Sequence, residues 1–335
     1  MSGEKIGFIE ISLKRNGGSL YNQQVKNALI KYFRLDEVIL QAKFFQKRRY
    51  LKFLESLYYL FILKGKKDVW IRDFYSVLSL SKKRTKGKNV ALIFHIDPSQ
   101  LPLLARLPMF LLEKLFFWRQ LKKADAIVTI CEYWKEYFLK MGYKNVHKIY
   151  NGFNMLDFQI TDNEVADFKK RFNLGEKPII YIGNCQKAKG VQEICQELKG
   201  LDVSLVASGE ETIKIPAKNL NLGYKDYLCL IKSSDIVVEM HKFKTGWSRI
   251  SHEAMLFRKP VIGSGAGGTE ELLRGGGQII CRDFKDLRPN VEYLLNHPKV
   301  REKMGENGYA YAKDFTMEKF EQDWVALIKN VINLE

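Results

Sequence analysis

The stretch that decides the fold is TGWSRISHEAM at residues 245–255, followed by KPVIGSGAGGTEE at residues 259–271. A glycine precedes a predicted helix that carries Glu253, and a short strand then ends in a glycine-rich loop. Glycines let a backbone approach a ligand closely, and a helix N-terminus offers free N–H groups and a positive dipole to phosphate. A glutamate one or two turns into the helix can accept both hydroxyls of a ribose. The stretch therefore predicts a nucleotide-binding edge.

Working outward, the second half of the chain repeats a pattern of apolar strand and polar loop. Strand candidates lie at residues 178–182, 203–207, 235–238, 260–262 and 277–280. Strands that alternate with helix signals are typical of βαβ units and a parallel sheet. We therefore expect a doubly wound α/β domain over residues 178–314, with its ligand site at the carboxyl ends of the strands.

The first half carries the same alternation. Its strand candidates are residues 5–13, 37–41, 68–71, 90–94, 125–130 and 146–150. This pattern predicts a second doubly wound domain over residues 1–155. Residues 156–177 are mostly polar with few strand signals, and we expect them to form a linker between the two domains.

The charge of the chain is concentrated in its first half. Residues 1–150 hold 29 Lys/Arg against 12 Asp/Glu, whereas residues 151–335 hold 26 of each, so the whole net charge of +17 lies in the first half. A surplus confined to one domain indicates an anionic partner for that domain. At 335 residues and 46% hydrophobic composition, the chain can bury two cores.

The cysteines and histidines point to neither disulfides nor a metal. The five cysteines form no C-x-x-C pair, so we expect buried thiols in a reduced, cytoplasmic compartment. The five histidines show no metal-ligand spacing with one another or with the cysteines.

Two stretches, residues 43–67 and 101–123, mix Lys and Arg with dense aromatic and aliphatic residues. Neither has 18 uninterrupted apolar residues, so neither spans a bilayer. Both fit a basic amphipathic face on an anionic membrane, although a crossover helix with its lysines in water is the alternative. Nucleic acid is the less favoured partner, because the basic residues flank dense apolar clusters rather than isolated stacking aromatics.

Short motifs in chain order resemble those of the family 4 glycosyltransferases, which are retaining enzymes of the GT-B fold. They are Asn16-Gly17-Gly18, Phe94-His95, ADAIVTICE at 124–132, Asn151-Gly152-Phe153-Asn154, Ile182-Gly183-Asn184 through Lys189-Gly190, the 245–271 stretch and Phe315-Thr316-Met317-Glu318. The resemblance covers nearly the whole chain. It implies two Rossmann-like domains facing a central cleft, and a C-terminal helix over residues 315–335 that crosses back to the N-terminal domain.

The resemblance also implies roles for individual residues. Lys189 would neutralise the diphosphate leaving group, Glu253 would hold the ribose hydroxyls and His95 would lie near the anomeric centre. The other expected donor-binding residues are Gly17, Gly18, Gly183, Asn184, Gly223, Tyr224, Gly246, Trp247 and Ser248, with Arg249 as a secondary candidate. No cofactor and no metal are implied, and the sequence has no D-x-D motif.

Two positions depart from the family's pattern. The first glutamate of its E-x7-E pair falls at Thr245, which we group with His95 and Lys189 as catalytic, and its diphosphate-binding arginine falls at Asn184. The departures concern the groups around the transferred sugar. A catalytically weak nucleotide-sugar-binding subunit is therefore one alternative, and a nucleotide-sugar epimerase or hydrolase of the same fold is another.

The main candidates also have purely structural interpretations. His95 could be a core histidine, Lys189 a solvated surface lysine, Glu253 a local cap or ion-pair partner, and Gly17-Gly18 a plain turn. Weighing these, we expect a metal-independent, retaining hexosyltransferase that uses a UDP-, GDP- or ADP-sugar. Its acceptor is expected to be a lipid-linked molecule or a glycan in glycan biosynthesis, with the protein peripheral on the inner face of a membrane.

Overall fold

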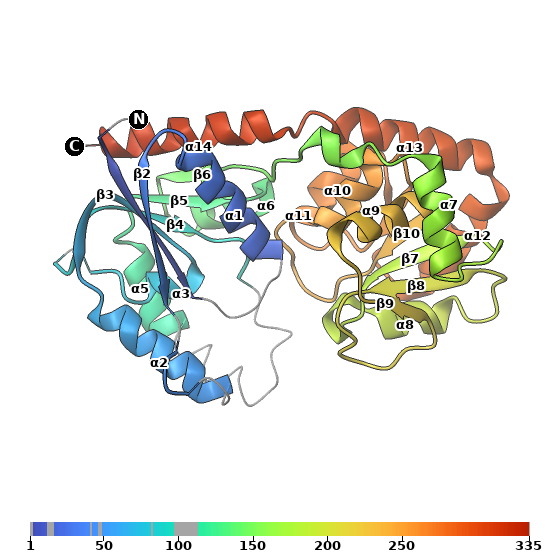
Figure 1. The fold of residues 1–335 in the computed structure, drawn as a ribbon, viewed down its shortest axis with the longest axis horizontal. Helices are drawn as coiled ribbons and strands as arrows, with labels where there is room; N and C mark the ends of the chain where they lie inside the picture. Colours follow the sequence, from blue (N-terminus) through green and yellow to red (C-terminus); the bar gives the residue numbers. More distant parts are fainter. Residues whose placement is uncertain are drawn as a thin grey trace. The chain divides into compact units, whose positions relative to one another are not determined.

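The structure, a computed structural model, describes residues 3–11, 17–40, 42–45, 49–81, 83–96 and 113–334. The chain divides into two compact units: unit 1 comprises Met1–Gly152 with Met317–Glu335, and unit 2 comprises Phe153–Thr316. Each unit is built on a six-stranded, all-parallel sheet with helices packed against it (Figure 1). The predicted α/β class with two doubly wound domains is confirmed.

Unit 2 has the strand order β12-β11-β10-β7-β8-β9. Its strands are β7 (Ile179–Asn184), β8 (Ser204–Ser208), β9 (Lys218–Leu220), β10 (Ile236–Glu239), β11 (Val261–Gly263) and β12 (Ile279–Ile280). The first strand, β7, is therefore flanked by β8 on one side and β10 on the other. The order of the strands reverses between β7 and β10, and ligands bind at the carboxyl side of such a switch point.

The helices of unit 2 cover both faces of its sheet. They are α7 (Asp162–Arg171), α8 (Val191–Glu197), α9 (Tyr224–Ser233), α10 (Arg249–Leu256), α11 (Gly268–Gly275), α12 (Leu287–Asn296) and α13 (Pro298–Ala312). Ile180 and Ile182 pack into a core shared with α8 and α12. The intervening Tyr181 points to the other face, where its ring meets Tyr227 of α9. This alternation is the period of two expected for a strand buried on both faces.

Unit 1 has the strand order β2-β1-β3-β4-β5-β6, with its switch point between β1 and β3. Its strands are β1 (Lys5–Ile11), β2 (Arg34–Leu40), β3 (Gly65–Arg72), β4 (Thr85–Leu92), β5 (Ala126–Thr129) and β6 (Val146–Lys148). Its helices are α1 (Gly17–Leu29), α2 (Arg49–Ile62), α3 (Phe74–Val77), η2 (Glu113–Phe117), α5 (Trp118–Leu121), α6 (Glu132–Lys140) and α14 (Met317–Ile332).

Each predicted strand overlaps an observed one, within the described residues. Two of the predicted strands also included residues 12–13 and 41, which lie outside the described residues. The sequence missed β9, because this three-residue strand pairs with β8 alone and has no apolar alternation. Short edge strands of this kind carry little pattern.

The segment expected as a linker, residues 156–177, instead contains helix α7 of unit 2. A capping box starts the helix, because the Thr161 side chain accepts from the Glu164 N–H while Glu164 accepts from the Thr161 N–H. Phe168 is its one fully buried side chain, so most of the helix faces water and its composition resembles that of a linker. The boundary between the units falls at Gly152–Phe153.

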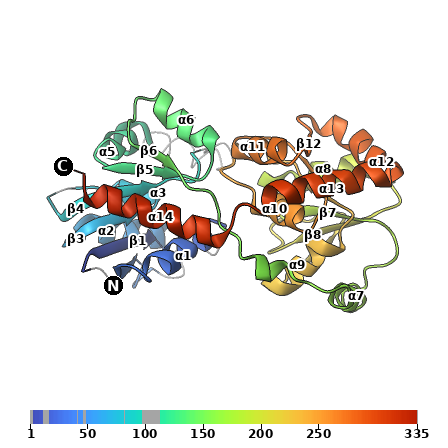
Figure 2. The same ribbon diagram turned by 90° about the horizontal axis from the view of Figure 1, so that it is seen from above.

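The C-terminal helix α14 belongs to unit 1, as the resemblance implied, and Figure 2 shows it lying along the sheet of that unit beside α1. Its apolar face is buried, with Phe320 and Trp324 against Tyr21 of α1. Tyr21 also accepts a hydrogen bond from the Trp324 indole at 3.2 Å and donates to the Ile149 carbonyl at 2.8 Å. This packing fixes the end of the chain on unit 1.

The chain passes between the units twice, and the unit 2 residues at the two crossings pair with each other. Phe153 and Thr316 form a parallel bridge, and the Phe153 N–H donates to the Phe315 carbonyl at 2.9 Å. Gly152 is required at the unit 1 side, because a Cβ there would lie 2.7 Å from Phe320 Cβ.

The two amphipathic stretches differ in how much of them is described. Residues 43–67 contain α2, whereas of residues 101–123 the structure describes only 113–123, which form η2 and α5. No helix in the described part of the chain has the length and hydropathy needed to cross a bilayer. All five cysteines are buried and free, as expected.

Candidate functional site

The candidate site of unit 2 lies at the carboxyl ends of β7, β8 and β10, around the switch point. Gly183, in β7, has a φ of +80°, and a Cβ built there would meet nothing closer than 4.0 Å. Gly209, directly after β8, has a φ of +82°. The two glycines leave the backbone at this edge open, which is the condition for a phosphate or sugar to approach it.

Asn184, the predicted counterpart of the family's arginine, is tied to the neighbouring strand. Its Oδ1 accepts a hydrogen bond from Ser208 Oγ at 3.1 Å, and Ser208 Oγ lies 2.7 Å from the Tyr181 hydroxyl. The amide therefore braces β7 against β8, and it carries no charge that could offset a diphosphate.

Lys189 closes a single 3-10 turn, η4 (Lys187–Lys189), directly after the end of β7. Its Nζ lies 3.2 Å from His241 Nε2 and 5.4 Å from the centroid of the Phe243 ring. Burial lowers the pKa of Lys189, and the Glu239 carboxylate opposes that shift. Lys189 is therefore a partly enclosed cation and not the solvated surface lysine of the alternative interpretation.

The glycine after this lysine is required by the close approach of β10. Gly190 has a φ of +71°, and a Cβ there would lie 2.4 Å from the Met240 carbonyl oxygen. Any other residue would force η4 away from the end of β10. The Lys-Gly pair seen in the sequence thus brings the Lys189 side chain toward the residues that follow β10.

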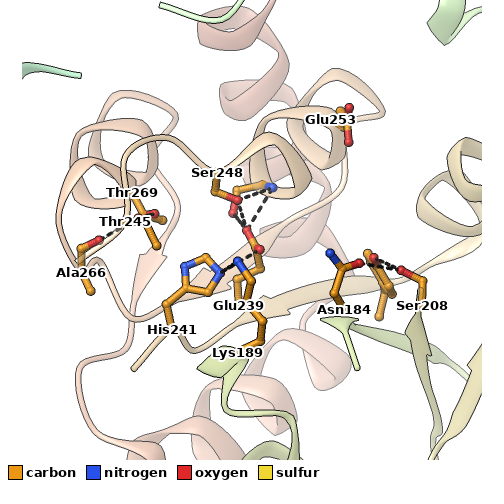
Figure 3. Close-up of polar contacts among 12 residues, drawn as sticks. Asn184, Lys189, Ser208, Glu239, His241, Thr245, Ser248, Glu253, Ala266 and Thr269 are labelled. Atoms are coloured by element: carbon orange, nitrogen blue, oxygen red, sulfur yellow. Dashed lines mark hydrogen bonds and ion pairs between the residues drawn. The ribbon is translucent and has the colours of Figure 1, made fainter. Parts of the chain in front are cut away.

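Glu239, the last residue of β10, is the buried carboxylate at the centre of the site and was not predicted. Figure 3 shows the side chains of Lys189, His241 and Ser248 converging on it. It accepts hydrogen bonds from the hydroxyls of Ser248 and Ser251, from the Ser251 N–H at 3.1 Å, and from His241 Nε2 at 3.1 Å. Burial alone would raise the pKa of Glu239, but His241, Lys189 and Ser248 lower it to about 2.

Glu253, the predicted ribose ligand, is buried on α10 and already has protein partners. Its Oε2 accepts from the Tyr227 hydroxyl at 2.7 Å, and its Oε1 pairs with Arg249 at 3.2 Å. Burial raises the pKa of Glu253. The local ion pair of the structural interpretation is therefore present, but each carboxylate oxygen keeps a further lone pair for a ligand hydroxyl.

Thr245 is joined to the glycine-rich loop. Its hydroxyl lies 2.9 Å from the Ala266 carbonyl and 2.5 Å from the Thr269 hydroxyl, and its backbone forms a bridge with Gly267 (Figure 3). Gly267 has a φ of +71°, and a Cβ there would lie 2.4 Å from the Thr245 carbonyl oxygen. In this structure the hydroxyl thus connects two loops, at a position where the family carries a carboxylate.

Trp247, predicted to bind the donor, has a side chain that packs into the interior of unit 2. Its indole donates to His252 Nδ1 at 3.2 Å, and His252 donates in turn to the Ala312 carbonyl at 3.0 Å. The His252 ring stacks on Phe153 at 3.9 Å. The indole therefore supports α10, and only backbone groups of Trp247 are left for the donor role.

The remaining predicted residues of unit 2 lie at helix starts. Ser248 is the N-cap of α10 and accepts from the Ser251 N–H at 3.1 Å, while Gly246, two residues earlier, is buried. Gly223 is the N-cap of α9 and Tyr224 is its first residue. The Tyr224 ring is 45% exposed and stacks with Tyr227, which holds Glu253. An exposed aromatic side chain beside the predicted ribose ligand, Glu253, is suited to contact a base.

Three predicted residues lie in unit 1. Gly17 and Gly18 are the first residues of α1, whereas Asn16 lies outside the described residues. His95 follows the end of β4 by three residues and its side chain is exposed, so it is not the core histidine of the alternative interpretation. Asp97 and Pro98, next to it in the sequence, lie outside the described residues.

The structure thus brings Asn184, Lys189, Thr245, Ser248 and Glu253 to one edge of unit 2. Sequence reasoning missed Glu239 and His241. The available signal was an acidic residue at the end of an apolar strand, Ile236–Glu239, immediately before the polar loop of the quoted stretch. Carboxylates are rarely buried unless they are paired, so a glutamate closing a core strand is informative.

Comparison with known proteins matches residues 162–311 to the family described as glycosyl transferases group 1. The capsular polysaccharide biosynthesis glycosyltransferase CapM of Staphylococcus aureus is 25% identical over 232 residues, which cover 60% of this chain and 59% of that protein. CapM and two further curated relatives are matched over 59–60% of their own length.

Solved structures resemble the chain over nearly its whole length. Sucrose-phosphate synthase from Thermosynechococcus elongatus has a TM-score of 0.79 at 14% identity, with 98% of this chain and 99% of that one covered. Anabaena HepE, in complex with UDP and glucose, has a TM-score of 0.74 at 15% identity, with 98% and 100% covered. These likenesses confirm the predicted GT-B fold.

Proposed function

Because residues 162–311 match the family described as glycosyl transferases group 1 and the chain has the GT-B fold, we propose that this protein is a retaining glycosyltransferase with a nucleotide-sugar donor. One observation carries the proposal most directly. Lys189 and Glu253, a cation and a carboxylate, lie at the switch-point edge of a doubly wound sheet, where such folds bind nucleotides.

In this proposal each side chain has a distinct task. Lys189 offsets the charge that develops on the leaving diphosphate, and a fixed donor aimed at developing charge lowers the barrier. Glu253 accepts the ribose hydroxyls beside Tyr227 and Arg249. The open backbone at Gly183 leaves room for the diphosphate. HepE, of the same fold, is in complex with UDP and glucose, which favours a uridine donor among the three classes.

His95 and the N-terminus of α1, both in unit 1, are proposed to bind the donor because of their positions in the fold. His95 follows a strand end in unit 1 and is exposed, as a residue that contacts the sugar must be. The α1 N-terminus at Gly17 and Gly18 offers N–H groups to an anionic ligand. With Lys189 taking the leaving-group charge, the proposed reaction needs neither a metal nor a cofactor.

We propose that unit 1 binds the acceptor and docks on an anionic membrane. The turn before α2 and the outer face of α2 expose large apolar side chains: Phe44 is 81% exposed, Leu54 58% and Tyr58 61%. Glu55 holds this turn, because its carboxylate accepts the N–H groups of Lys43, Phe44 and Phe45 at 2.7–3.1 Å. Apolar side chains among basic residues suit the headgroup region of an anionic leaflet.

Binding and turnover with a donor panel test the proposal. Calorimetry with UDP, GDP and ADP, followed by incubation of their sugar conjugates with lipid-linked and glycan acceptors, should give one bound nucleotide and transfer with retained anomeric configuration. Transfer with inversion contradicts the retaining mechanism. Binding without transfer identifies a binding subunit, and release of free or epimerised sugar identifies a hydrolase or an epimerase.

A further inference from the structure

Glu239 has no role in the proposed chemistry, yet it joins the two parts of the donor site. The residue is 3% exposed, at the last position of β10, beside β7 at the switch point. Its two carboxylate oxygens face different groups. Oε1 faces His241, whereas Oε2 faces the start of α10.

On one side, Glu239 holds the helix that carries the proposed ribose ligand. Oε2 accepts from the hydroxyls of Ser248 and Ser251 and from the Ser251 N–H, all in the first turn of α10. Glu253 follows in the next turn. A carboxylate at a helix N-terminus is also favoured by the helix dipole. The first turn of α10 is therefore fixed to the end of β10.

On the other side, Glu239 reaches the proposed diphosphate ligand through one imidazole. His241 Nε2 lies 3.1 Å from Glu239 Oε1 and 3.2 Å from Lys189 Nζ. Because Nε2 donates its proton to Glu239, it cannot also accept a hydrogen bond from Lys189, so Glu239 acts on the lysine through its charge. Burial lowers the pKa of Lys189 and Glu239 raises it, while burial and Lys189 lower the pKa of His241. Glu239 opposes the lowering of the His241 pKa as well, and its negative charge favours the ammonium form of Lys189.

We infer that Glu239 is a positioning residue that sets the spacing between Lys189 and helix α10 and keeps Lys189 charged before a nucleoside diphosphate arrives. The inference rests on the proposed function, since it assumes that this edge binds a diphosphate. The lysine then meets the diphosphate in its cationic form and in a fixed place, so neither protonation nor ordering opposes binding.

Glu239→Gln tests the inference, because it keeps the shape of the side chain and removes its charge. The probe is whichever of UDP, GDP and ADP binds the wild type best, with the matching monophosphate as comparator, titrated by calorimetry from pH 6 to 9. We expect diphosphate affinity to fall about tenfold at pH 7, as for one lost charge-assisted contact. The loss should grow toward pH 9, because a buried lysine without its carboxylate loses its proton at lower pH. Monophosphate affinity should change less.

A double-mutant comparison separates positioning through Lys189 from a general effect on folding. Lys189→Ala should remove the pH dependence seen in Glu239→Gln, and the double variant should lose less affinity than the sum of the two single losses. Glu193→Gln is the matched control, because it removes the charge of another glutamate of the same unit, one that pairs with Lys242. It should bind the diphosphate as the wild type does.

The outcomes distinguish failure of this inference from failure of the proposed function. If Glu239→Gln binds the diphosphate with wild-type affinity and pH profile, or if its loss adds fully to that of Lys189→Ala, this inference is overturned while the proposed function stands. A wild type that binds none of the three diphosphates overturns both. If Glu239→Gln does not fold, His241→Gln replaces it. This variant removes the ring that contacts both Glu239 and Lys189, so it should lower diphosphate affinity more than monophosphate affinity. Affinities equal to those of the wild type overturn the inference.

Discussion

Both units end a strand at their switch point with a buried charged side chain, but the two charges have opposite signs and different surroundings. Arg72 ends β3 in unit 1, and Glu239 ends β10 in unit 2. Arg72 donates to four neutral acceptors at 2.6–3.4 Å, the side chains of Asn89, Thr85 and Ser79 and the Ser76 carbonyl. The hydrogen-bond partners of Arg72 are all scaffold residues. Those of Glu239 include the start of the helix that carries Glu253, and His241, which lies beside Lys189.

The same contrast holds for the charge of the units as a whole. Unit 1 holds 31 Lys/Arg against 16 Asp/Glu, an excess of 15, whereas unit 2 holds 24 against 22, an excess of 2. In unit 2 the charges at the sheet edge pair with one another, as a site for a small anionic ligand requires. In unit 1 the acidic residues are too few to balance the basic ones, and an excess of positive charge of this kind suits a surface that binds a large anionic partner. The same fold therefore occurs twice in this chain with two different charge distributions.

Among the tests of this contrast, replacement of Arg72 should have the largest effect. Arg72→Met should lower the free energy of unfolding by about 3–4 kcal/mol, because the acceptors around the buried guanidinium lose their donor. Its nucleotide affinity, measured where the protein is folded, should remain that of the wild type. Chemical denaturation and calorimetry measure the two effects, with the exposed Arg84→Met as control. A large loss of nucleotide affinity in Arg72→Met would show that the cation of unit 1 also serves the site.

Glu253 provides the corresponding test in unit 2. Glu253→Ala should weaken nucleotide binding by roughly 1.5–3 kcal/mol, the value of a charge-assisted hydrogen bond. The matched variant is Glu37→Ala in unit 1, since Glu37 pairs with the buried Lys26 at 2.8 Å but lies on β2. It should leave nucleotide affinity unchanged. Equal affinity in both variants, by calorimetry, contradicts the assignment of Glu253.

The units should also differ in acid, because unit 2 buries the neutral imidazole of His252. Burial lowers the pKa of His252 from 6.5 to about 3. The unfolded chain therefore takes up the proton first as the pH falls, so stability is full above about pH 6.5 and is lost below it. Between pH 7 and 5 this loss amounts to about 2 kcal/mol for one such histidine.

His252→Asn isolates that contribution. The raised pKa of Glu253 acts in the opposite direction but is common to both proteins, so it cancels in the comparison. The variant should be less stable at pH 7 and lose less stability than the wild type between pH 7 and 5, as followed by denaturant titration at each pH. Parallel loss in the two proteins would mean that His252 does not titrate as its burial implies.

The smallest expected effect concerns the apolar surface of unit 1. Phe44→Ser should weaken binding to anionic vesicles by about 1 kcal/mol, since the ring would be only partly buried in the headgroup region. Added salt should weaken the wild type further. Leu139→Ser, a change at another exposed apolar residue of unit 1, is the control. Co-sedimentation that is equal for Phe44→Ser and wild type contradicts this docking surface, and failure of the wild type to sediment contradicts membrane docking.

Most of the architecture could be predicted from local sequence. Apolar runs such as Ile179–Ile182 and Ile236–Val238 mark strands, because a strand buried on both faces needs an unbroken apolar stretch. Gly190 and Gly267 mark close backbone approaches, since both have a positive φ and no room for a Cβ. Lys189 and Glu253 were found because their motifs surround them closely in the chain.

Only the tertiary structure decided what these residues touch. Glu239 meets Ser251, 12 positions away, and His241 meets Lys189, 52 positions away, because parallel strands bring distant carboxyl ends to one edge. The inward position of Trp247 depends on a contact between two helices, because its partner His252 on α10 is held by Ala312 of α13, 60 positions further on. Hydrophobic periodicity encodes burial along one element, but the partner of a buried polar group depends on which elements become neighbours.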